Sequence, residues 1–302
     1  HEYFAAGEVL APFGPDWRYG PPGTDIPVSV ASPLRSVYTS AAEGARYAAQ
    51  LFAERENPQG QAVLLVKAGE AYRRARLEEG WQRLAAEQAL ALPGGRPAGY
   101  PPLYWEVRGQ SFAALMAFLA RWGPAPAHGP AADVGAGIGW LSYRLAQLGY
   151  RVLAVDASLD PDFGPRAAER LYLPQVSMGL AQGGLEHPPL REGALSLIVL
   201  NASLHYVVDL EGALSRNARA LRPGGRLVIL DTPVSRRPRP GTGRGDRHLG
   251  RRELQEALKS AGLSARWIGV RRGRAWALHQ LKAWLRRTPR FSFPMVIAER
   301  LR

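Results

Sequence analysis

The most informative segment of the sequence is Asp133-Val-Gly135-Ala-Gly137-Ile-Gly139-Trp140. It follows the short apolar run 131–134 and precedes an amphipathic segment over 139–148, so the pattern predicts a loop between a strand and a helix. Glycine has no Cβ, and three glycines in one loop let the backbone approach a ligand closely. In a parallel α/β sheet such a loop lies at the carboxyl ends of the strands, where these sheets bind ligands.

The spacing of these glycines separates two classes of nucleotide-binding loop. A dinucleotide fingerprint that begins at Gly135 needs a glycine at position 140, which is Trp140 here, and the third glycine comes one residue earlier. The next predicted strand ends in Asp156, whose carboxylate is placed to accept hydrogen bonds from ribose hydroxyls. A glycine turn and a solvated aspartate are each ordinary alone. Together they favour a nucleoside site and disfavour a nicotinamide-dependent oxidoreductase.

From residue 131 onward, apolar runs alternate with amphipathic segments. The expected strands are 131–134, 151–155, a run near 175–181, 195–200, 226–231, 263–270 and 291–298. The expected helices are 139–148, 164–172, 210–221, 250–261 and 274–287. This alternation predicts an α/β fold with a doubly wound, Rossmann-like parallel sheet covered by helices on both faces.

The first 125 residues have a different texture. Residues 1–35 are rich in Pro, Gly and aromatic residues and predict an irregular arm, whereas apolar residues at helical spacing predict helices over 41–56, 61–91 and 111–121. The segment GPAPAHGP over 123–130 is expected to be a linker. We therefore expect an N-terminal irregular arm and helical cap over 1–125 and a Rossmann-like domain over 126–302.

Composition excludes several classes of protein. The chain has 302 residues, of which 46% are hydrophobic and 22% charged, which argues against a disordered chain. No apolar run approaches the roughly 20 residues that a membrane-spanning helix needs. There are no cysteines, so disulfides, thiolate metal sites and a cysteine nucleophile are excluded, and we expect no metal. The first residues lack the pattern of a signal peptide, so we expect a cytoplasmic protein.

The positive charge is concentrated at one end. Residues 236–302 carry 18 basic and four acidic residues, a net charge of +14, whereas the whole chain carries +13. Arginine enrichment throughout the chain is the simpler explanation; the alternative is an anionic partner. The basic, amphipathic segment 271–287 is expected either to pack Leu281, Trp284 and Leu285 on the body or to lie on anionic lipid or nucleic acid.

The predicted strand 195–200 leads into the loop Asn201-Ala-Ser-Leu-His205-Tyr206, opposite the glycine loop. A histidine there, helped by Tyr206, is suited to deprotonate or orient an acceptor hydroxyl, because its ordinary pKa is near neutrality. His205 is equally consistent with a structural hydrogen-bonding role. Asn201 is expected either to contact a cofactor or to cap the strand end.

Taken together, these residues resemble a known family. The pattern D-x-G-x-G-x-G, the strand-end Asp156 and the segment LRPGGRLVIL resemble class I S-adenosylmethionine-dependent methyltransferases, and the segments around Asn201 and Trp105 resemble a bacterial subgroup without assigned acceptors. The resemblance covers 126–235 well and 250–302 by topology. It implies seven strands, the last two an antiparallel pair, with Asp133 and the glycine loop on the methionine part of the cofactor and Asp156 on its ribose. The expected cofactor contacts are Asp133, Gly135, Ala136, Gly137, Gly139, Trp140, Asp156, Ala157, Gly184, Leu185 and Asn201.

Two positions depart from the family pattern. Relatives commonly carry aspartate at the position of Gly184, where it contacts the adenine amino group, and another at the position of Ser196. Glu186 is the nearest carboxylate to the first of these. These departures keep open a non-catalytic protein that binds the cofactor.

The resemblance implies methyl transfer from S-adenosylmethionine by in-line displacement, with a small-molecule or lipid acceptor. Tyr104 and Arg108, with Trp105 between them, are the candidate acceptor contacts, and His205 and Tyr206 the candidate catalytic residues. The alternative acceptor is RNA, held by the basic C-terminal region. No N-P-P-Y or D-P-P-Y motif follows the fourth strand, which disfavours amino methylation of bases.

Overall fold

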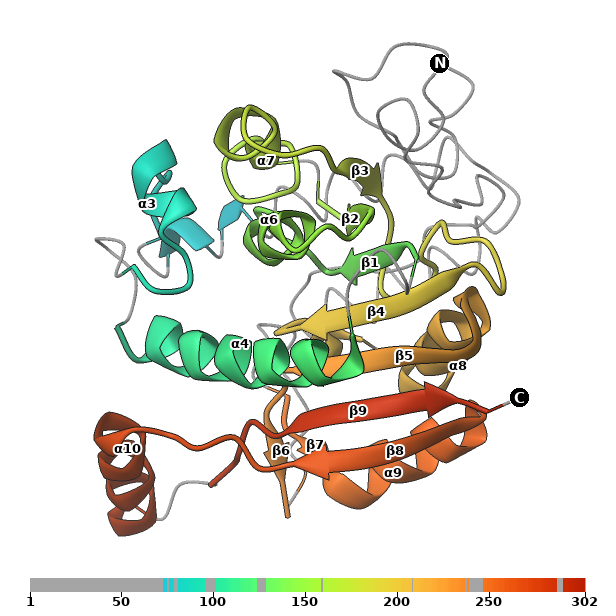
Figure 1. Ribbon diagram of the computed structural model, residues 1–302. Coiled ribbons are helices and arrows are strands. Elements are labelled where there is room, and N and C mark those ends of the chain that lie inside the picture. The colour runs from blue at the N-terminus through green and yellow to red at the C-terminus, as the bar shows by residue number, and fades with distance from the viewer. Residues whose placement is uncertain are drawn as a thin grey trace.

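A computed structural model describes residues 73–74, 76–78, 81–95, 102–123, 129–158, 160–207, 209–236, 238, 247–286 and 290–301. Seven strands form one sheet in the order β3-β2-β1-β4-β5-β9-β8 (Figure 1). Their bounds are β1 Ala131–Val134, β2 Val152–Asp156, β3 Gly179–Gln182, β4 Leu195–Asn201, β5 Leu221–Leu230, β8 Leu263–Ile268 and β9 Met295–Arg300. A separate parallel pair joins β6 Val234–Ser235 to β7 Leu249–Gly250.

The sheet confirms the predicted fold class. β1 pairs in parallel with β2 and β4, and β4 pairs in parallel with β5, which places their carboxyl ends at one edge. β9 runs antiparallel to both β5 and β8, so the last two strands form the expected antiparallel pair. Strand order reverses between β1 and β4, which is the position where such sheets bind ligands.

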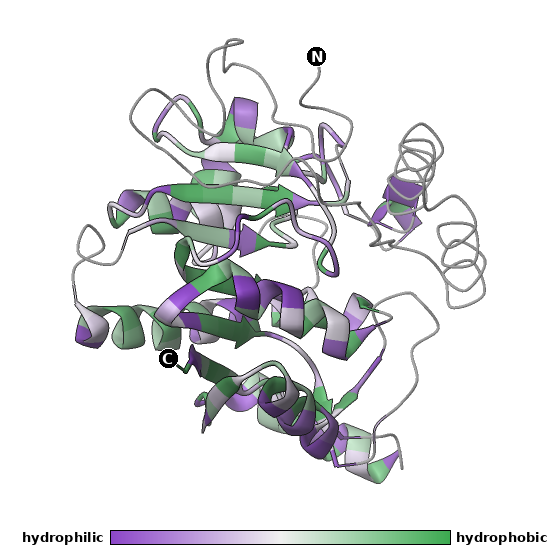
Figure 2. Ribbon diagram, turned by 90° about the vertical axis from the view of Figure 1, so that its right-hand side faces the viewer, coloured by the Kyte–Doolittle hydropathy of each residue, from purple (hydrophilic) through white to green (hydrophobic). Residues whose placement is uncertain are grey.

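Helices cover both faces of the sheet (Figure 1). The helix bounds are α3 Ala86–Leu90, α4 Pro102–Trp122, α6 Trp140–Gln147, α7 Ala167–Leu171, α8 Leu210–Ala220, α9 Arg251–Ser260 and α10 Arg274–Leu285, with a 3₁₀ turn η2 at Leu204–Tyr206. Figure 2 shows the sheet strands mostly in the hydrophobic colour and the helices mixed. This contrast is expected because central parallel strands are buried on both faces, whereas a covering helix is buried on one.

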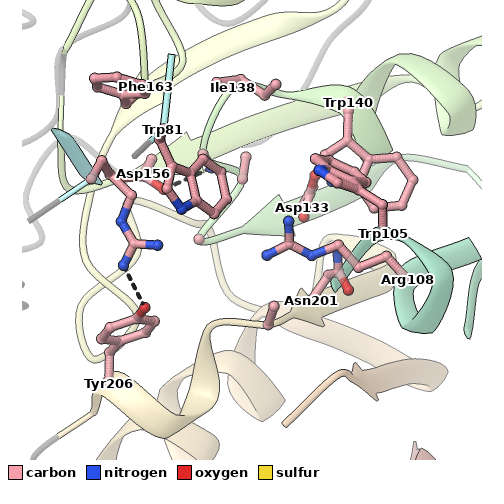
Figure 3. Close-up of a pocket in the computed structure, with 15 residues that line it drawn as sticks. Trp81, Trp105, Arg108, Asp133, Ile138, Trp140, Asp156, Phe163, Asn201 and Tyr206 are labelled. Carbon is pink, nitrogen blue, oxygen red and sulfur yellow. Dashed lines mark hydrogen bonds between the residues drawn. The ribbon is translucent and has the colours of Figure 1, made fainter. Parts of the chain in front are cut away.

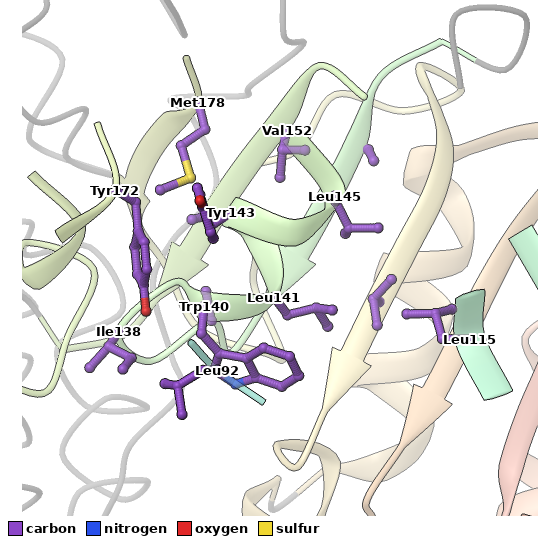
Figure 4. Packing of buried hydrophobic residues seen from close by; sticks show 14 of the residues in the cluster. Leu92, Leu115, Ile138, Trp140, Leu141, Tyr143, Leu145, Val152, Tyr172 and Met178 are labelled. Atoms are coloured by element: carbon purple, nitrogen blue, oxygen red, sulfur yellow. The ribbon is translucent and has the colours of Figure 1, made fainter. Parts of the chain in front are cut away.

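Two hydrophobic clusters lie on opposite faces of the sheet. Ala131 of β1 belongs to the cluster that contains α4, α6 and α7, and Ala132 belongs to the cluster that contains α8 and α9. This alternation follows from the two-residue period of a strand. Figure 4 shows the first cluster, in which Leu115 of α4 and Trp140 and Leu141 of α6 pack together.

Several predicted boundaries were wrong. α4 begins at Pro102 and not near residue 111, because a proline in the first helical position lacks only an N–H that a helix start leaves unpaired anyway. The helix expected over 61–91 is not continuous, since residues 81–85 are not helical between the helical residues 76–78 and α3. α7 is shorter than predicted, β3 begins later, and β6 and β7 were not predicted.

The N-terminal predictions are only partly covered. The arm over 1–35 and the helix over 41–56 lie outside the described residues. Leu84, Trp105 and Leu115 share one hydrophobic cluster with α6 and the sheet, so the described part of the N-terminal region packs on the same core. The division of the chain near residue 125 stays a prediction. Within the described ranges, no helix combines the length and apolar character needed to cross a bilayer.

Candidate functional site

A pocket opens at the carboxyl ends of β1, β2 and β4. It encloses about 670 Å³ of space between atoms, part of it open solvent. The residues that line it are Arg76, Trp81, Trp105, Arg108, Asp133, Gly135, Ala136, Gly137, Ile138, Trp140, Asp156, Phe163, Asn201, Ala202 and Tyr206. Figure 3 shows Trp105, Arg108, Asp133, Trp140 and Asn201 gathered on one side, and Trp81, Asp156, Phe163 and Tyr206 on the other.

The glycine loop forms the floor of this pocket. Gly135 and Gly137 have φ angles of 81° and 52°, in the left-handed region that favours glycine. A Cβ at Gly135 would collide with the Cβ of Ser203, whose Oγ donates to the carbonyl oxygen of Val134 at 3.0 Å. The loops after β1 and β4 therefore touch, and a side chain at Gly135 would separate them.

Asp156 holds the glycine loop in shape. Its Oδ2 accepts from the backbone N–H of Gly137 at 2.8 Å, and its Oδ1 accepts from the N–H of Ser158 at 2.9 Å. The side chain is buried and lines the pocket. A carboxylate oxygen has more than one acceptor site, so a carboxylate in this place suits a ligand hydroxyl.

Asp133 is a buried carboxylate that lines the pocket. Its Oδ2 accepts from Ser142 Oγ at 2.7 Å, and its Oδ1 is buried without a hydrogen-bond partner. Burial raises the pKa of Asp133 to about 7, with a smaller contribution from the charge of Asp156, and the Ser142 bonds oppose this. An unpaired buried carboxylate oxygen is costly, so its presence in a pocket indicates a ligand donor.

Two arginines and several aromatic rings close the pocket. The Cζ of Arg108 lies 4.8 Å from the centroid of Trp105 and 5.7 Å from that of Trp81, and the Cζ of Arg76 lies 5.0 Å from Trp81. Among the described residues, no carboxylate lies within ion-pair distance of Arg108. Stacking on aromatic faces keeps a guanidinium oriented while its N–H groups remain available to an anion.

The wall that carries Arg76 and Trp81 is tied to the loop after β2. Arg73 donates to Asp160 at 2.8 Å and to Asp162 at 3.1 Å, and Arg83 pairs with Asp162 at 3.3 Å. Arg170 of α7 also donates to the carbonyl oxygen of Leu84 at 2.8 Å. These bonds place the segment around Trp81 over the pocket.

The loop after β4 supplies a further part of the wall. Asn201 ends β4, and Ala202 has a φ of 52°, a strained value for a residue with a Cβ. Tyr206 lines the pocket, and its hydroxyl accepts from Arg76 at 3.1 Å, the bond dashed in Figure 3. His205 is not among the lining residues; its ring lies 4.4 Å from that of Tyr206, centroid to centroid.

The structure brings together ten of the residues singled out in the sequence: Asp133, Gly135, Ala136, Gly137, Trp140, Asp156, Asn201, Tyr206, Trp105 and Arg108. It leaves six others off the pocket lining: Gly139, Ala157, Gly184, Leu185, His205 and Tyr104. Tyr104 is 56% exposed, and the backbone carbonyl of Leu185 accepts from Asn217. Gly139 instead allows α6 to approach α7, since a Cβ there would lie 3.3 Å from that of Ala168.

The two departures from the family pattern lie away from the pocket lining. Ser196 is near the amino end of β4, and its Oγ donates to the carbonyl oxygen of Pro130 at 2.9 Å. Glu186 accepts from the backbone N–H of Asp209 at the start of α8. Gly184 is also off the lining.

Sequence reasoning missed Arg76, Trp81, Ile138, Phe163 and Ala202 as lining residues. Ile138 and Ala202 sit inside loops that were already identified, so the loops themselves were the available signal. Arg76 and Trp81 carry no motif, and only tertiary packing brings them to the pocket.

A second buried carboxylate stands at the end of β5. Asp231 accepts a hydrogen bond from Ser111 of α4, and its Oδ1 lies 3.8 Å from Arg272, both side chains being largely buried. Burial raises the pKa of Asp231, while Ser111, Arg272 and Arg108 lower it. This cluster joins α4, β5 and the segment before α10.

Comparison with known proteins agrees with this geometry. Residues 132–229 match the family model described as a methyltransferase domain. An uncharacterized methyltransferase of Mycobacterium tuberculosis is 39% identical over 98 residues, which make up 32% of this chain and 37% of that protein. Malonyl-[acyl-carrier protein] O-methyltransferase of Methylococcus capsulatus is 34% identical over 116 residues, or 38% of this chain and 41% of that protein. The chain thus spans less than half the length of these curated relatives.

Solved structures share the fold. A geranyl diphosphate methyltransferase in complex with S-adenosylmethionine superposes with a TM-score of 0.52 at 20% identity, covering 74% of this chain and 98% of that one. Phosphoethanolamine N-methyltransferase 2 of Haemonchus contortus superposes with a TM-score of 0.53 at 14% identity, covering 76% of this chain and 61% of that one. At these identities the likeness concerns the fold alone.

Proposed function

We propose that this chain, which contains a class I S-adenosylmethionine-dependent methyltransferase domain, binds that cofactor in the pocket and transfers its methyl group to a small-molecule or lipid acceptor. The observation that carries the proposal is Asp133, a buried carboxylate with an unpartnered oxygen beside a glycine loop. The family match over 132–229 supports the same cofactor.

The lining residues fit the groups of the cofactor. Asp133 suits a cationic amino group, because its free oxygen is buried and its charge is otherwise uncompensated. Arg108, on the same side of the pocket, suits a carboxylate, and the methionine part carries both groups. Asp156, on the opposite side, suits the ribose hydroxyls. A Cβ at Gly137 would have only the carbonyl oxygen of Phe163 within 4 Å, so the missing side chain leaves room for the ligand there.

The cofactor supplies an electrophilic methyl group on a sulfonium, and the protein's part is to orient, to desolvate and to hold protons. The indole rings of Trp81, Trp105 and Trp140 exclude water from the pocket walls. Tyr206 presents its hydroxyl to the pocket. Arg76 donates a hydrogen bond to the oxygen of this hydroxyl, which leaves the hydroxyl proton available to an acceptor molecule. We assign acceptor positioning to Tyr206 and the orientation of its ring to His205.

Titration calorimetry with S-adenosylmethionine and S-adenosylhomocysteine tests the binding step. We expect micromolar affinity for the unaltered chain and at least a tenfold loss for Asp156→Ala. Glu192→Gln, which changes an exposed carboxylate, serves as the control and should bind normally. A folded chain that binds neither compound would contradict the proposal.

Transfer itself is tested with radiolabelled methyl donor against panels of carboxylic acids, hydroxyl compounds and lipids. Turnover with any of these supports the enzyme, and Asp133→Asn should lower it at a limiting concentration of the methyl donor. Cofactor binding without transfer to any panel, RNA included, would instead favour the non-catalytic alternative.

A further inference from the structure

Helix α10 turns an apolar stripe toward solvent. Leu278, Leu281 and Leu285 follow one another at intervals of three and four residues, which places them on one helix face. They are 56%, 50% and 66% exposed, and the adjoining Trp284 is 58% exposed. Half of the large hydrophobic side chains that are exposed within the described residues therefore lie on this one helix.

The opposite face of α10 fixes this orientation. Trp276 is buried, and its ring lies 5.2 Å from Phe293 and 5.6 Å from Phe291, centroid to centroid. Phe291 and Phe293 lie 5.2 Å apart, so the three rings form one aromatic anchor. The expectation that Leu281, Trp284 and Leu285 pack on the body was therefore wrong, because Trp276 occupies that contact.

Within the sequence segment that contains α10, the charge is all of one sign. Residues 257–298 contain nine basic residues and no aspartate or glutamate. Arg271, Arg274, Lys282 and Arg286 are exposed on or beside α10. The exposed face thus has three leucines and a tryptophan at its centre and cations at its rim. This composition is typical of a helix that lies in the plane of a membrane interface.

We infer that α10 is a docking surface for a membrane that carries anionic lipids. Apolar side chains enter the boundary between headgroups and acyl chains, while the arginines and Lys282 stay at the level of lipid phosphates. Nucleic acid would use the cations but would leave the leucine stripe in water. A second copy of the chain would cover the stripe but bring these cations against one another.

The surface stands at the edge of the sheet where the pocket lies. Arg272, two residues before α10, donates to the carbonyl oxygen of Val107 at 2.7 Å. Val107 lies on α4 between Trp105 and Arg108, which line the pocket. Figure 1 shows α10 projecting from the body beside the start of α4. Docking therefore places the α4 side of the pocket near the lipid, independently of what the pocket binds.

Flotation of the full chain with vesicles tests the inference. One set contains phosphatidylcholine alone, and the other contains phosphatidylcholine with a third phosphatidylglycerol. We expect binding to the anionic set that weakens with salt, and at least tenfold less binding to the neutral set.

Two variants separate the contributions. Leu281→Ala with Leu285→Ala removes apolar surface, and we expect at least a tenfold loss of partitioning. Lys282→Gln with Arg286→Gln removes two charges; at about 1 kcal/mol each the loss is roughly 30-fold on anionic vesicles. Leu148→Ala, which trims an exposed leucine after α6, is the matched control and should bind like the unaltered chain.

Several outcomes would overturn the inference. No flotation with anionic vesicles would do so without any variant. Equal flotation of the unaltered chain and the leucine variant would remove the stripe from the interaction. If the chain does not bind vesicles but binds RNA in a salt-sensitive way, and the leucine variant still binds RNA, the surface belongs to nucleic acid. If the chain does not bind vesicles but forms dimers that the leucine variant no longer forms, the surface belongs to a second copy.

Discussion

The glycine loop and helix α10 both carry residues suited to binding, but they differ in how far the sequence alone identifies them as binding sites. The loop is buried, its ligand-facing groups are backbone and carboxylate, and its spacing follows from local geometry. The face of α10 that meets solvent depends on Trp276 finding Phe291 and Phe293. A motif that specifies its own backbone can be recognised in sequence, whereas a helix face is assigned only by its tertiary partners.

The largest expected effect is at the loop. Gly135→Ala forces a left-handed backbone on a residue with a Cβ, at about 1–2 kcal/mol, and brings that Cβ against Ser203. We expect a loss of about 3 kcal/mol in the free energy of unfolding in urea, with cofactor binding abolished. Gly193 has a φ of 70°, and a Cβ there would have no atom within 4 Å. Gly193→Ala therefore measures the cost of the left-handed backbone alone. Equal losses for both variants would show that contact with Ser203 contributes nothing.

On α10, the comparison can be made within one helix. Trp276→Ala removes the buried anchor, and we expect a loss of about 3 kcal/mol. Trp284→Ala removes an exposed ring of the same kind and should change stability by less than about 0.5 kcal/mol. Chemical denaturation of both variants measures this. Similar losses at the two positions would mean that the stripe packs against the protein after all.

Substitutions at Asp133 and at its hydrogen-bond donor Ser142 test whether the Asp133 carboxylate binds the cofactor. Asp133→Asn keeps the shape but removes the charge, and we expect a 10- to 100-fold weaker affinity for S-adenosylmethionine by calorimetry. Ser142→Ala, which removes only the donor to Oδ2, should cost less. If Asp133→Asn binds like the unaltered chain, the carboxylate does not contact the cofactor.

The same carboxylate gives a pH dependence with a defined sign. The pKa of Asp133 is raised from 3.8 to about 7, so between these values the folded state binds a proton that the unfolded state has released. This group therefore makes stability fall as pH rises from about 4 to about 7, and adds no further change above that range. Asp133→Asn removes this slope and should be more stable than the unaltered chain at pH 8, as measured by urea unfolding across pH. An unchanged slope would show that Asp133 does not carry the raised pKa.

The sheet and the pocket lining around the glycine loop were predictable because strand periodicity, glycine spacing and the strand-end position of Asp156 are local features. The start of α4 was missed because residues 104–108 carry no helical periodicity of their own, and Trp105 is buried in a cluster formed with distant residues such as Trp140. Arg76 and Trp81 were missed because ion pairs of Arg73 and Arg83 with the loop after β2 bring them to the pocket. His205 was expected at the pocket, but the turn η2 leaves Tyr206 on the lining instead.

The smallest expected effects distinguish these last two residues. Tyr206→Phe removes only the hydroxyl that accepts from Arg76, and we expect a loss of about 1 kcal/mol or less in stability with a clear fall in kcat once an acceptor is known. His205→Ala leaves that hydroxyl in place, so kcat should fall less while the pH profile keeps its shape. A pH profile of kcat that loses its limb near neutral pH only in His205→Ala would make His205 the proton acceptor and Tyr206 its support, because of these two side chains only an imidazole ordinarily titrates in that range.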